Sequence, residues 1–572
     1  MGSGLSTPPW VLILLLSSIA TFGNVSLLIA LFFLVAPFIL LWTSHRYLAR
    51  FTNNRWLSAG GAFLYALSPV SIASINSGRL GVLVFLALLP SFVGGLQDWN
   101  SIEARSWRRI FAYSLFIWIM FAFNPSVCLI LLVAIAITLV RDYFANSRDF
   151  RNTLFVERVK KRLTLFVIPL LLSAPGSFSY FVHPWKMWSE IGFQVTGGGP
   201  NLAFFGNPGG PGSLPWWCLS PLTIILFVTF FSTTAARRFS TPGLIFLLSG
   251  TVFSSFVVTG NGSSTPSRAF AGTFLAIATL FSISAAVVMF DKIKVRLEQS
   301  HLNYRHISIA AILAITVAYS ATSIFWLMTT GANSPLRTAS SQILPAFLSV
   351  EKDAKTVVLR PYRHQGEYAI SYYISRGSDI FLGETEIAPQ DTPEISHAIE
   401  GLVDNTGVTS SKVLAAYGIK YVFLKSPVDQ EVAQTIDGLG GFNRTSSTSA
   451  GIVWRTLQDT GRIIYVDYSG KRKILPFHGV RTFVPGPGAI TITETFSKSW
   501  QVLQDGFRLA KAQDEYGLPT FEVTIGGHIS IIHDGTIRRA WISFFVIVLV
   551  LTIVLSLPAG RRKSEISESE LA

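Results

Sequence analysis

Long apolar runs alternate with short polar segments over the first 330 residues of the chain. Most runs come close to the roughly 20 residues that a helix needs to cross the hydrocarbon core of a bilayer. This pattern predicts crossings at 24–43, 57–73, 81–97, 163–182, 216–234, 243–260, 269–290, 306–328 and 540–557. The run 9–22 is shorter, and two interpretations of it are open: an extra span, or a helix lying in the membrane interface.

One further apolar run, 110–140, is interrupted by Asn124-Pro125-Ser126. Asn followed by Pro is a turn signal, and both ends of the run are basic, so the run is predicted to fold as a hairpin of two short helices. The total is then about eleven transmembrane helices, or twelve if 9–22 also spans the membrane.

Lys and Arg residues are distributed unequally between the loops. The loops on one side, with the C-terminal tail, hold twenty-two of them, whereas the alternate loops hold only Arg79, Lys186 and Arg268. Cytoplasmic loops carry the excess of Lys and Arg in multi-pass proteins. The asymmetry predicts a multi-pass protein of the plasma (inner) membrane with a cytoplasmic C-terminus.

After residue 330 the long apolar runs stop, and short β-rich runs separated by turn residues replace them. Residues 331–460 are predicted to be an α/β subdomain and 461–539 a β-sandwich, both extracytoplasmic, with 540–572 forming a final transmembrane helix and cytoplasmic tail. The predicted fold class is therefore a polytopic α-helical membrane protein, membrane domain 1–330, with an extracytoplasmic mixed α/β and β-sandwich domain.

Composition agrees with this picture. Hydrophobic residues make up 50% of the chain and charged residues only 14%, against about a quarter in soluble domains. The net charge of +14 lies mostly in the basic loops, so it directs topology and does not indicate nucleic-acid binding. Two cysteines exclude a disulfide framework.

Motifs of soluble enzymes are missing from the sequence: it contains no Walker A loop, no GxGxxG, no HExxH and no CxxC. No metal site and no cofactor is therefore predicted. The remaining candidates are ionisable groups at the outer ends of helices. Arg79 and Arg268 are isolated cations beside apolar runs, and two interpretations are open: a site for a lipid phosphate or pyrophosphate, or arginines that snorkel to lipid phosphates.

Other outer-side residues give weaker signals. Glu190, close to His183 and Lys186, is a candidate catalytic acid or base, or a simple salt-bridge partner of Lys186. The glycine-rich stretch 197–212 either approaches a ligand closely or is a flexible connector. Trp500 in the outer domain either stacks on a sugar or belongs to the sandwich core.

Several segments resemble the membrane half of bacterial cell-envelope glycosyltransferases of the GT-C type. They include Tyr65-Ala66-Leu67-Ser68-Pro69, Ser77-Gly78-Arg79-Leu80-Gly81 and the outer segment Ala415-Ala416-Tyr417-Gly418-Ile419. The order of features is similar to that of arabinofuranosyltransferases and of polytopic regions fused to family-2 glycosyltransferase domains. The resemblance covers most of the chain, through short motifs.

The resemblance implies transfer of a sugar from a polyprenyl-phosphate donor to a cell-envelope glycan on the outer face. Arg79, Arg268 and Lys186 would hold the lipid phosphate, and Glu190 or His183 would act as general base. The chain departs from the family in having no carboxylate before Asp98. Either a companion glycosyltransferase chain carries the missing acid, or activity is lost, or Glu190 substitutes.

Two further classes remain as alternatives. The first is a non-catalytic membrane protein for envelope glycan assembly or export with a glycan-binding outer domain. The second is a transporter, which paired inverted hydropathy halves would favour, although none is evident. The expected partners are membrane lipid, the lipid-linked donor, the envelope glycan and the companion chain.

Overall fold

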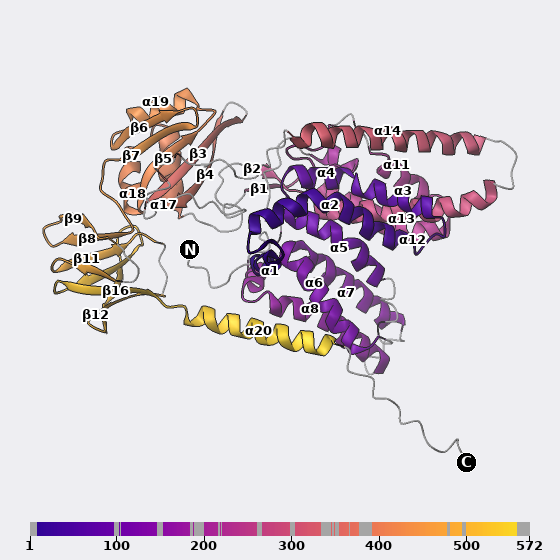
Figure 1. The fold of residues 1–572 in the computed structure, drawn as a ribbon, viewed down its shortest axis with the longest axis horizontal. Helices are drawn as coiled ribbons and strands as arrows, with labels where there is room; N and C mark the ends of the chain where they lie inside the picture. The colour runs from indigo at the N-terminus through magenta and orange to yellow at the C-terminus, as the bar shows by residue number, and fades with distance from the viewer. Residues whose placement is uncertain are drawn as a thin grey trace, which may run out of the picture.

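The computed structural model describes residues 9–96, 102, 105–145, 153–182, 187, 199–215, 218, 220–259, 266–297, 304–332, 345, 348, 354–364, 367–376, 392–476, 481–494 and 499–557. A bundle of helices occupies the first part of the chain, and a β-rich region follows it (Figure 1). A last long helix runs from the β-rich region back along the bundle. The predicted combination of apolar helices and a C-terminal β region is thus confirmed.

The bundle is built mainly from α-helices, with one short β-hairpin of β1 (Val257–Thr259) and β2 (Pro266–Arg268). Its helices are α1 (Pro9–Ser17), α2 (Val25–Leu48), α3 (Arg55–Ala66), α4 (Pro69–Asn76), α5 (Leu80–Leu96), α6 (Trp107–Phe123), α7 (Ser126–Ala145), α8 (Thr153–Leu172), α9 (Ser179–Val182), α10 (Pro200–Phe204), α11 (Pro221–Phe230), α12 (Thr234–Phe253), α13 (Gly272–Leu297) and α14 (Tyr304–Ala332), with short 3₁₀ turns η1 (Ser18–Thr21) and η3 (Gly176–Phe178).

Five of the described helices are long and apolar enough to cross a membrane: α2, α7, α13, α14 and the C-terminal α20 (Thr536–Ser556). The pair α3 and α4, bent by 40° at Leu67-Ser68, makes a sixth if it is one broken span. Other predicted crossings are shorter or more polar, because α5 has 17 residues and α11 has 10, and α8 and α12 carry basic residues in their first halves. The total of eleven crossings stays a prediction.

The predicted interruption at Asn124-Pro125 is confirmed, since α6 ends at Phe123 and α7 begins at Ser126. The predicted crossing 243–260 is wrong at both ends. The helix starts earlier, where Thr233 accepts a hydrogen bond from the Ala236 N–H, and ends at Phe253 before strand β1. β-branched residues after Ser254-Ser255 continue the apolar run as a strand, which hydropathy alone cannot distinguish from a helix.

Small residues let the helices approach closely. A Cβ at Gly61 of α3 would lie 2.9 Å from Leu48 of α2 and 3.1 Å from Ile283 of α13, and one at Gly243 of α12 would lie 2.8 Å from Leu226 of α11. Helix association in a bilayer depends on such packing because lipid tails are as apolar as the side chains that leave them. Glycine at these crossings therefore determines how near the helices lie.

A buried ionic cluster lies at the end of the bundle where α7 ends and α8 begins. Asp142 accepts a hydrogen bond of 2.8 Å from Arg162, whose side chain is completely buried. Arg141, half exposed, and Arg158 contact the same carboxylate at 3.1 and 3.6 Å. A charge removed from water is tolerated only when it is paired, so Asp142 balances the buried guanidinium.

The first part of the β-rich region is a five-stranded sheet of order β4-β3-β5-β7-β6, in which only β3 and β5 are parallel. One face is covered by three helices, and their apolar side chains form one core with the sheet. The strands are β3 (Lys355–His364), β4 (Glu367–Arg376), β5 (Ile419–Lys425), β6 (Phe442–Thr448) and β7 (Gly451–Thr456), and the helices are α17 (Pro393–Val403), α18 (Ser410–Ala416) and α19 (Gln430–Gly438).

The second part is a β-sandwich of two antiparallel sheets, ordered β14-β15-β11-β8-β9 and β10-β16-β12-β13. Inward-facing residues of both sheets share one hydrophobic cluster, so the sheets pack face to face. The strands are β8 (Ile463–Asp467), β9 (Arg472–Ile474), β10 (Arg481–Val484), β11 (Gly488–Ile492), β12 (Trp500–Gln504), β13 (Phe507–Arg508), β14 (Lys511–Gln513), β15 (Pro519–Val523) and β16 (Gly527–His533).

The two parts of the β-rich region share a polar joint. Lys355, at the start of β3, donates hydrogen bonds to the carbonyl oxygens of Tyr417 and Thr493 and lies 3.3 Å from the Glu494 carboxylate. Tyr417 also donates a 2.9 Å hydrogen bond to the carbonyl oxygen of Tyr516 in the sandwich, and burial raises the pKa of the Tyr417 hydroxyl. These contacts hold the two parts in one orientation.

We expect Asp142→Ala to lower the free energy of unfolding by about 3 kcal/mol, because it leaves the buried Arg162 guanidinium without its carboxylate. Arg141→Gln is the matched control: it removes a half-exposed partner of the same carboxylate and should cost less than about 1 kcal/mol. Denaturant titration in detergent micelles measures both. Equal losses would show that burial of Arg162 does not govern the cluster.

Candidate functional site

Arg79 lies in the connection between α4 and α5, at the end of the bundle. The connection turns tightly: the N–H of Arg79 donates a 2.9 Å hydrogen bond to the carbonyl of Ser74, and Gly78 has a left-handed φ of 66°. Such a turn closes a helix and favours glycine at the left-handed position. Arg79 as a whole residue is 7% exposed, so this cation is buried.

Phe270 packs against the Arg79 guanidinium, whose central carbon lies 4.5 Å from the ring centroid. Arg268, two residues earlier at the end of strand β2, is exposed, and Gly199 lies so close to it that a Cβ there would be 2.8 Å from an Arg268 nitrogen. The structure therefore brings the two predicted arginines to the same end of the bundle. Their convergence on a common cavity stays a prediction.

Three helices begin around Arg79: α5 at Leu80, α7 at Ser126 and α13 at Gly272. A Cβ at Gly81 would collide with the carbonyl of Phe123, which keeps the start of α5 against the connection that leads into α7. The buried Asn124 amide then donates a 2.8 Å hydrogen bond to Thr273 Oγ1. That bond ties the start of α7 to the start of α13.

These three helix starts give the region a positive electrostatic character. A helix N-terminus carries roughly half a positive elementary charge, and its free N–H groups are a ready site for anions. The segments 68–83, 120–130, 199–215 and 266–275, which form this end of the bundle, contain no Asp or Glu. Arg79 and the helix dipoles both contribute positive charge to this end of the bundle.

A glycine-rich turn packs on the same region. Asn207 in this turn donates a 2.7 Å hydrogen bond to the Leu214 carbonyl, and the Gly212 carbonyl accepts hydrogen bonds from Asn76 at 2.7 Å and Trp326 at 3.3 Å. Residues 206–210 are all buried. The described part of the turn is therefore a packed element, and the interpretation as a flexible connector is wrong for it.

Left-handed backbone explains the glycine content of the turn. Gly206, Gly209, Gly210 and Gly212 have φ values of 78°, 76°, 104° and 73°, which side-chain-bearing residues rarely adopt. A Cβ at Gly212 would also lie 2.6 Å from Asn76, whereas one at Gly206 would meet open space. The glycines thus allow the turn to lie against the end of α4.

Of the remaining predicted site residues, the structure describes only Trp500. His183, Lys186 and Glu190 lie outside the described residues. Trp500 is partly buried against the sandwich core, and its ring meets His533 edge-on at 4.8 Å between centroids. This position corresponds to the core interpretation of Trp500.

Sequence reasoning missed Asn124, Thr273 and Phe270 as components of this region. Asn124 was recognised only as a turn signal, although Asn inside an apolar run must find a hydrogen-bond partner. Phe270 and Thr273 belong to an ordinary apolar run, and no sequence signal places them beside Arg79.

Comparison with protein-family models, with curated proteins and with solved structures finds no match to this chain. The fold and the site define a class at the level of architecture: a protein with several apolar helices of membrane-spanning length and a β-rich region in its C-terminal part. No family is assigned beyond this class.

We expect Gly212→Ala to destabilise the protein by about 2 kcal/mol more than Gly206→Ala. Both variants place a Cβ at left-handed backbone, but only Gly212 also faces Asn76 at 2.6 Å. Denaturant titration in detergent micelles gives the two free energies. Equal destabilisation would mean that packing of the turn against α4 contributes little.

Proposed function

We propose that this chain is the membrane component of a cell-envelope glycosyltransferase that uses a polyprenyl-phosphate-linked sugar on the outer face of the membrane. The observation that carries the proposal is the position of Arg79: a buried residue whose guanidinium stacks on Phe270, directly before α5, where the start of α5 contacts the connection into α7 and the starts of α7 and α13 are bonded to each other. Cations held at membrane depth are costly, and functional partners are the usual reason for retaining them.

A phosphate group fits this arrangement better than other anions. A guanidinium forms two parallel hydrogen bonds with phosphate oxygens, and helix N-termini favour phosphate through their N–H groups and dipoles. Phe270 covers one face of the Arg79 guanidinium. Arg268, exposed at the end of β2, would meet the same head group from the membrane surface.

The orientation is part of the proposal. The Lys and Arg distribution supports an outer position for Arg79, Arg268 and the β-rich region and a cytoplasmic position for the C-terminus. In Figure 1 the β1–β2 hairpin lies at the end of the bundle nearest the β-rich region. The phosphate site and the β-rich region would then be on one side of the membrane.

Sugar transfer also needs a general base close to the carrier phosphate. Glu190 and His183 are the candidates that the chain offers, with Lys186 as a further phosphate ligand, and a companion glycosyltransferase chain is the alternative source of the base. The described segments around Arg79 contain no carboxylate. This favours a base that is delivered from outside these segments.

A second candidate is a non-catalytic protein for envelope glycan assembly or export. Its support is the β-sandwich, because folded outer domains of this architecture can bind a partner without any catalytic group. In that case Arg79 would hold a lipid phosphate while other proteins carry out the transfer.

The purified chain in nanodiscs is expected to bind a fluorescent polyprenyl monophosphate and to transfer no sugar. Arg79→Ala and Arg79→Lys should both weaken binding at least about tenfold, since lysine lacks the bidentate fork and a lost charge-assisted hydrogen bond costs about 1.5–3 kcal/mol. Fluorescence titration measures the dissociation constants.

Arg237→Gln is the matched control, because Arg237 is an exposed arginine at the start of α12, among the residues assigned to the cytoplasmic side. Its affinity should equal that of the unmodified chain. Undiminished binding by both Arg79 variants would refute the phosphate site. Robust transfer by the purified chain, abolished by Glu190→Gln, would show that the catalytic site is complete and would remove the companion chain from the proposal.

The proposed topology is tested by single cysteines in a Cys128→Ser, Cys218→Ser background. An impermeant thiol reagent added to intact cells should label Ser447→Cys on strand β6, and should label Ser232→Cys between α11 and α12 only after lysis. Both positions are exposed in the folded protein, so accessibility reports the side of the membrane. The reverse pattern would invert the topology and place the Arg79 site in the cytoplasm.

A further inference from the structure

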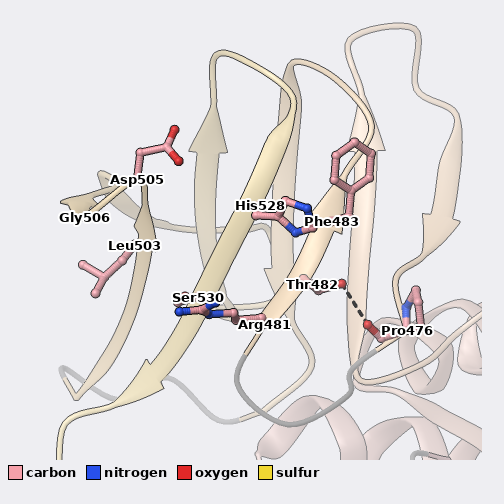
Figure 2. A pocket seen from close by; sticks show the side chains of 9 residues that line it. All are labelled: Pro476, Arg481, Thr482, Phe483, Leu503, Asp505, Gly506, His528 and Ser530. Atoms are coloured by element: carbon pink, nitrogen blue, oxygen red, sulfur yellow. Dashed lines mark hydrogen bonds between the residues drawn. The ribbon is translucent and has the colours of Figure 1, made fainter.

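The outward face of the four-stranded sheet of the sandwich carries a hollow of about 790 Å³ (Figure 2). Cavities that bind small ligands in proteins usually measure about 300–1,000 Å³. The hollow is lined by Pro476, Arg481, Thr482, Phe483, Leu503, Asp505, Gly506, His528 and Ser530. Arg481, Phe483, His528 and Ser530 lie on the face opposite to the sandwich core, since they alternate with the inward-facing Val484, Ile529 and Ile531.

Strand register aligns the side chains in the hollow. Arg481 of β10 is paired with Ser530 of β16, and Phe483 is paired with His528. Each pair points to the same face, because directly opposite residues of an antiparallel sheet share a face. Phe483 is 55% exposed and meets the His528 ring at 5.2 Å between centroids. An apolar ring therefore stands in solvent among polar groups.

Asp505 closes the other side of the hollow from the turn between β12 and β13. Asp505 and Gly506 have left-handed φ values of 50° and 88°, as in the two-residue turns of β-hairpins. The turn places the Asp505 carboxylate across the hollow from the two strands that carry Arg481 and His528 (Figure 2). No ion pair joins Arg481 or Asp505 to another residue within the described part of the chain.

We propose that this hollow binds a neutral carbohydrate chain. A sugar ring has an apolar face of C–H groups that can stack on Phe483, and hydroxyl groups at its edge that both donate and accept hydrogen bonds. Asp505 accepts such bonds, Arg481 donates them, and His528 and Ser530 do either. The charges of Arg481 and Asp505 cancel, which favours an uncharged ligand.

The position of the hollow disfavours lipid as the ligand. His533 ends β16 just before α20, whereas His528 lies five strand residues earlier, roughly 16 Å further from the membrane helix at the usual rise per residue. The proposal rests on the outward orientation of the β-rich region given above. In this proposal Phe483, and not the predicted Trp500, is the aromatic residue of the outer domain that contacts carbohydrate.

The test uses the full-length protein in nanodiscs and beads that carry immobilised mannan, galactan, arabinan or α-glucan. At least one polysaccharide should retain the protein. Phe483→Ala and Asp505→Asn should each reduce retention at least tenfold, and Asn keeps the left-handed turn because it tolerates positive φ. Tyr468→Ala is the matched control, since Tyr468 is an exposed aromatic residue outside the hollow, 76% accessible.

Thermal unfolding confirms that each variant is folded. If Phe483→Ala does not fold, Phe483→Leu replaces it, because leucine removes the flat ring but keeps an apolar side chain. Failure of all four polysaccharides to retain the protein, or retention unchanged in both hollow variants, would overturn the proposal. The assay contains no polyprenyl phosphate, and Arg79→Ala should bind polysaccharide normally. A result against carbohydrate binding in the hollow can therefore be distinguished from a result against phosphate binding at Arg79.

Discussion

Polar groups that interrupt helices inside an apolar environment must find their partners within the protein, and this constraint organises the end of the bundle around Arg79. A buried N–H or C=O group that finds no hydrogen-bond partner costs free energy, because water does not reach it. The breaks at Gly78 and Asn124 and the start of α13 therefore lie together: Asn124 bonds to Thr273, and Asn76 bonds to the glycine-rich turn. The same contacts that satisfy these groups bring three helix N-termini to one place.

The buried arginines at the two ends of the bundle have different surroundings. At one end Arg162 is neutralised by Asp142, which makes the cluster a structural element. At the other end Arg79 stacks on Phe270 among segments that contain no Asp or Glu. Arg162 therefore belongs to a structural ion pair, whereas the described surroundings of Arg79 include an aromatic ring and helix N-termini.

Hydropathy and turn residues predicted the division into apolar helices and a β-rich region, and the break at Asn124-Pro125, because both depend on local composition. They did not predict where α12 ends, since Val257 and Val258 continue its apolar run as a strand. The packing of the glycine-rich turn was also missed, because its partner Asn76 lies more than a hundred residues earlier. Sequence identified Arg79 as an isolated cation, but only tertiary contacts show what surrounds it.

The sandwich joins the last helix through a short and well-bonded connection. Asp534, directly after β16, accepts hydrogen bonds from the Thr536 N–H at 2.9 Å and its hydroxyl at 2.6 Å, and its own N–H donates to the Ser499 carbonyl. Hydrogen bonds from Thr536 hold the pKa of Asp534 below its ordinary value.

The same helix, α20, packs on α6 and α8, where Phe545 contacts the buried Trp118 at 5.7 Å between ring centroids. A strand, a two-residue connection and a packed helix leave little freedom for the sandwich to swing about its attachment point. A ligand held on the sandwich would consequently stay at a limited range of distances from the bundle. A flexible tether would allow a much wider range, so the short connection is the feature that would couple a glycan on the sheet to a phosphate at Arg79.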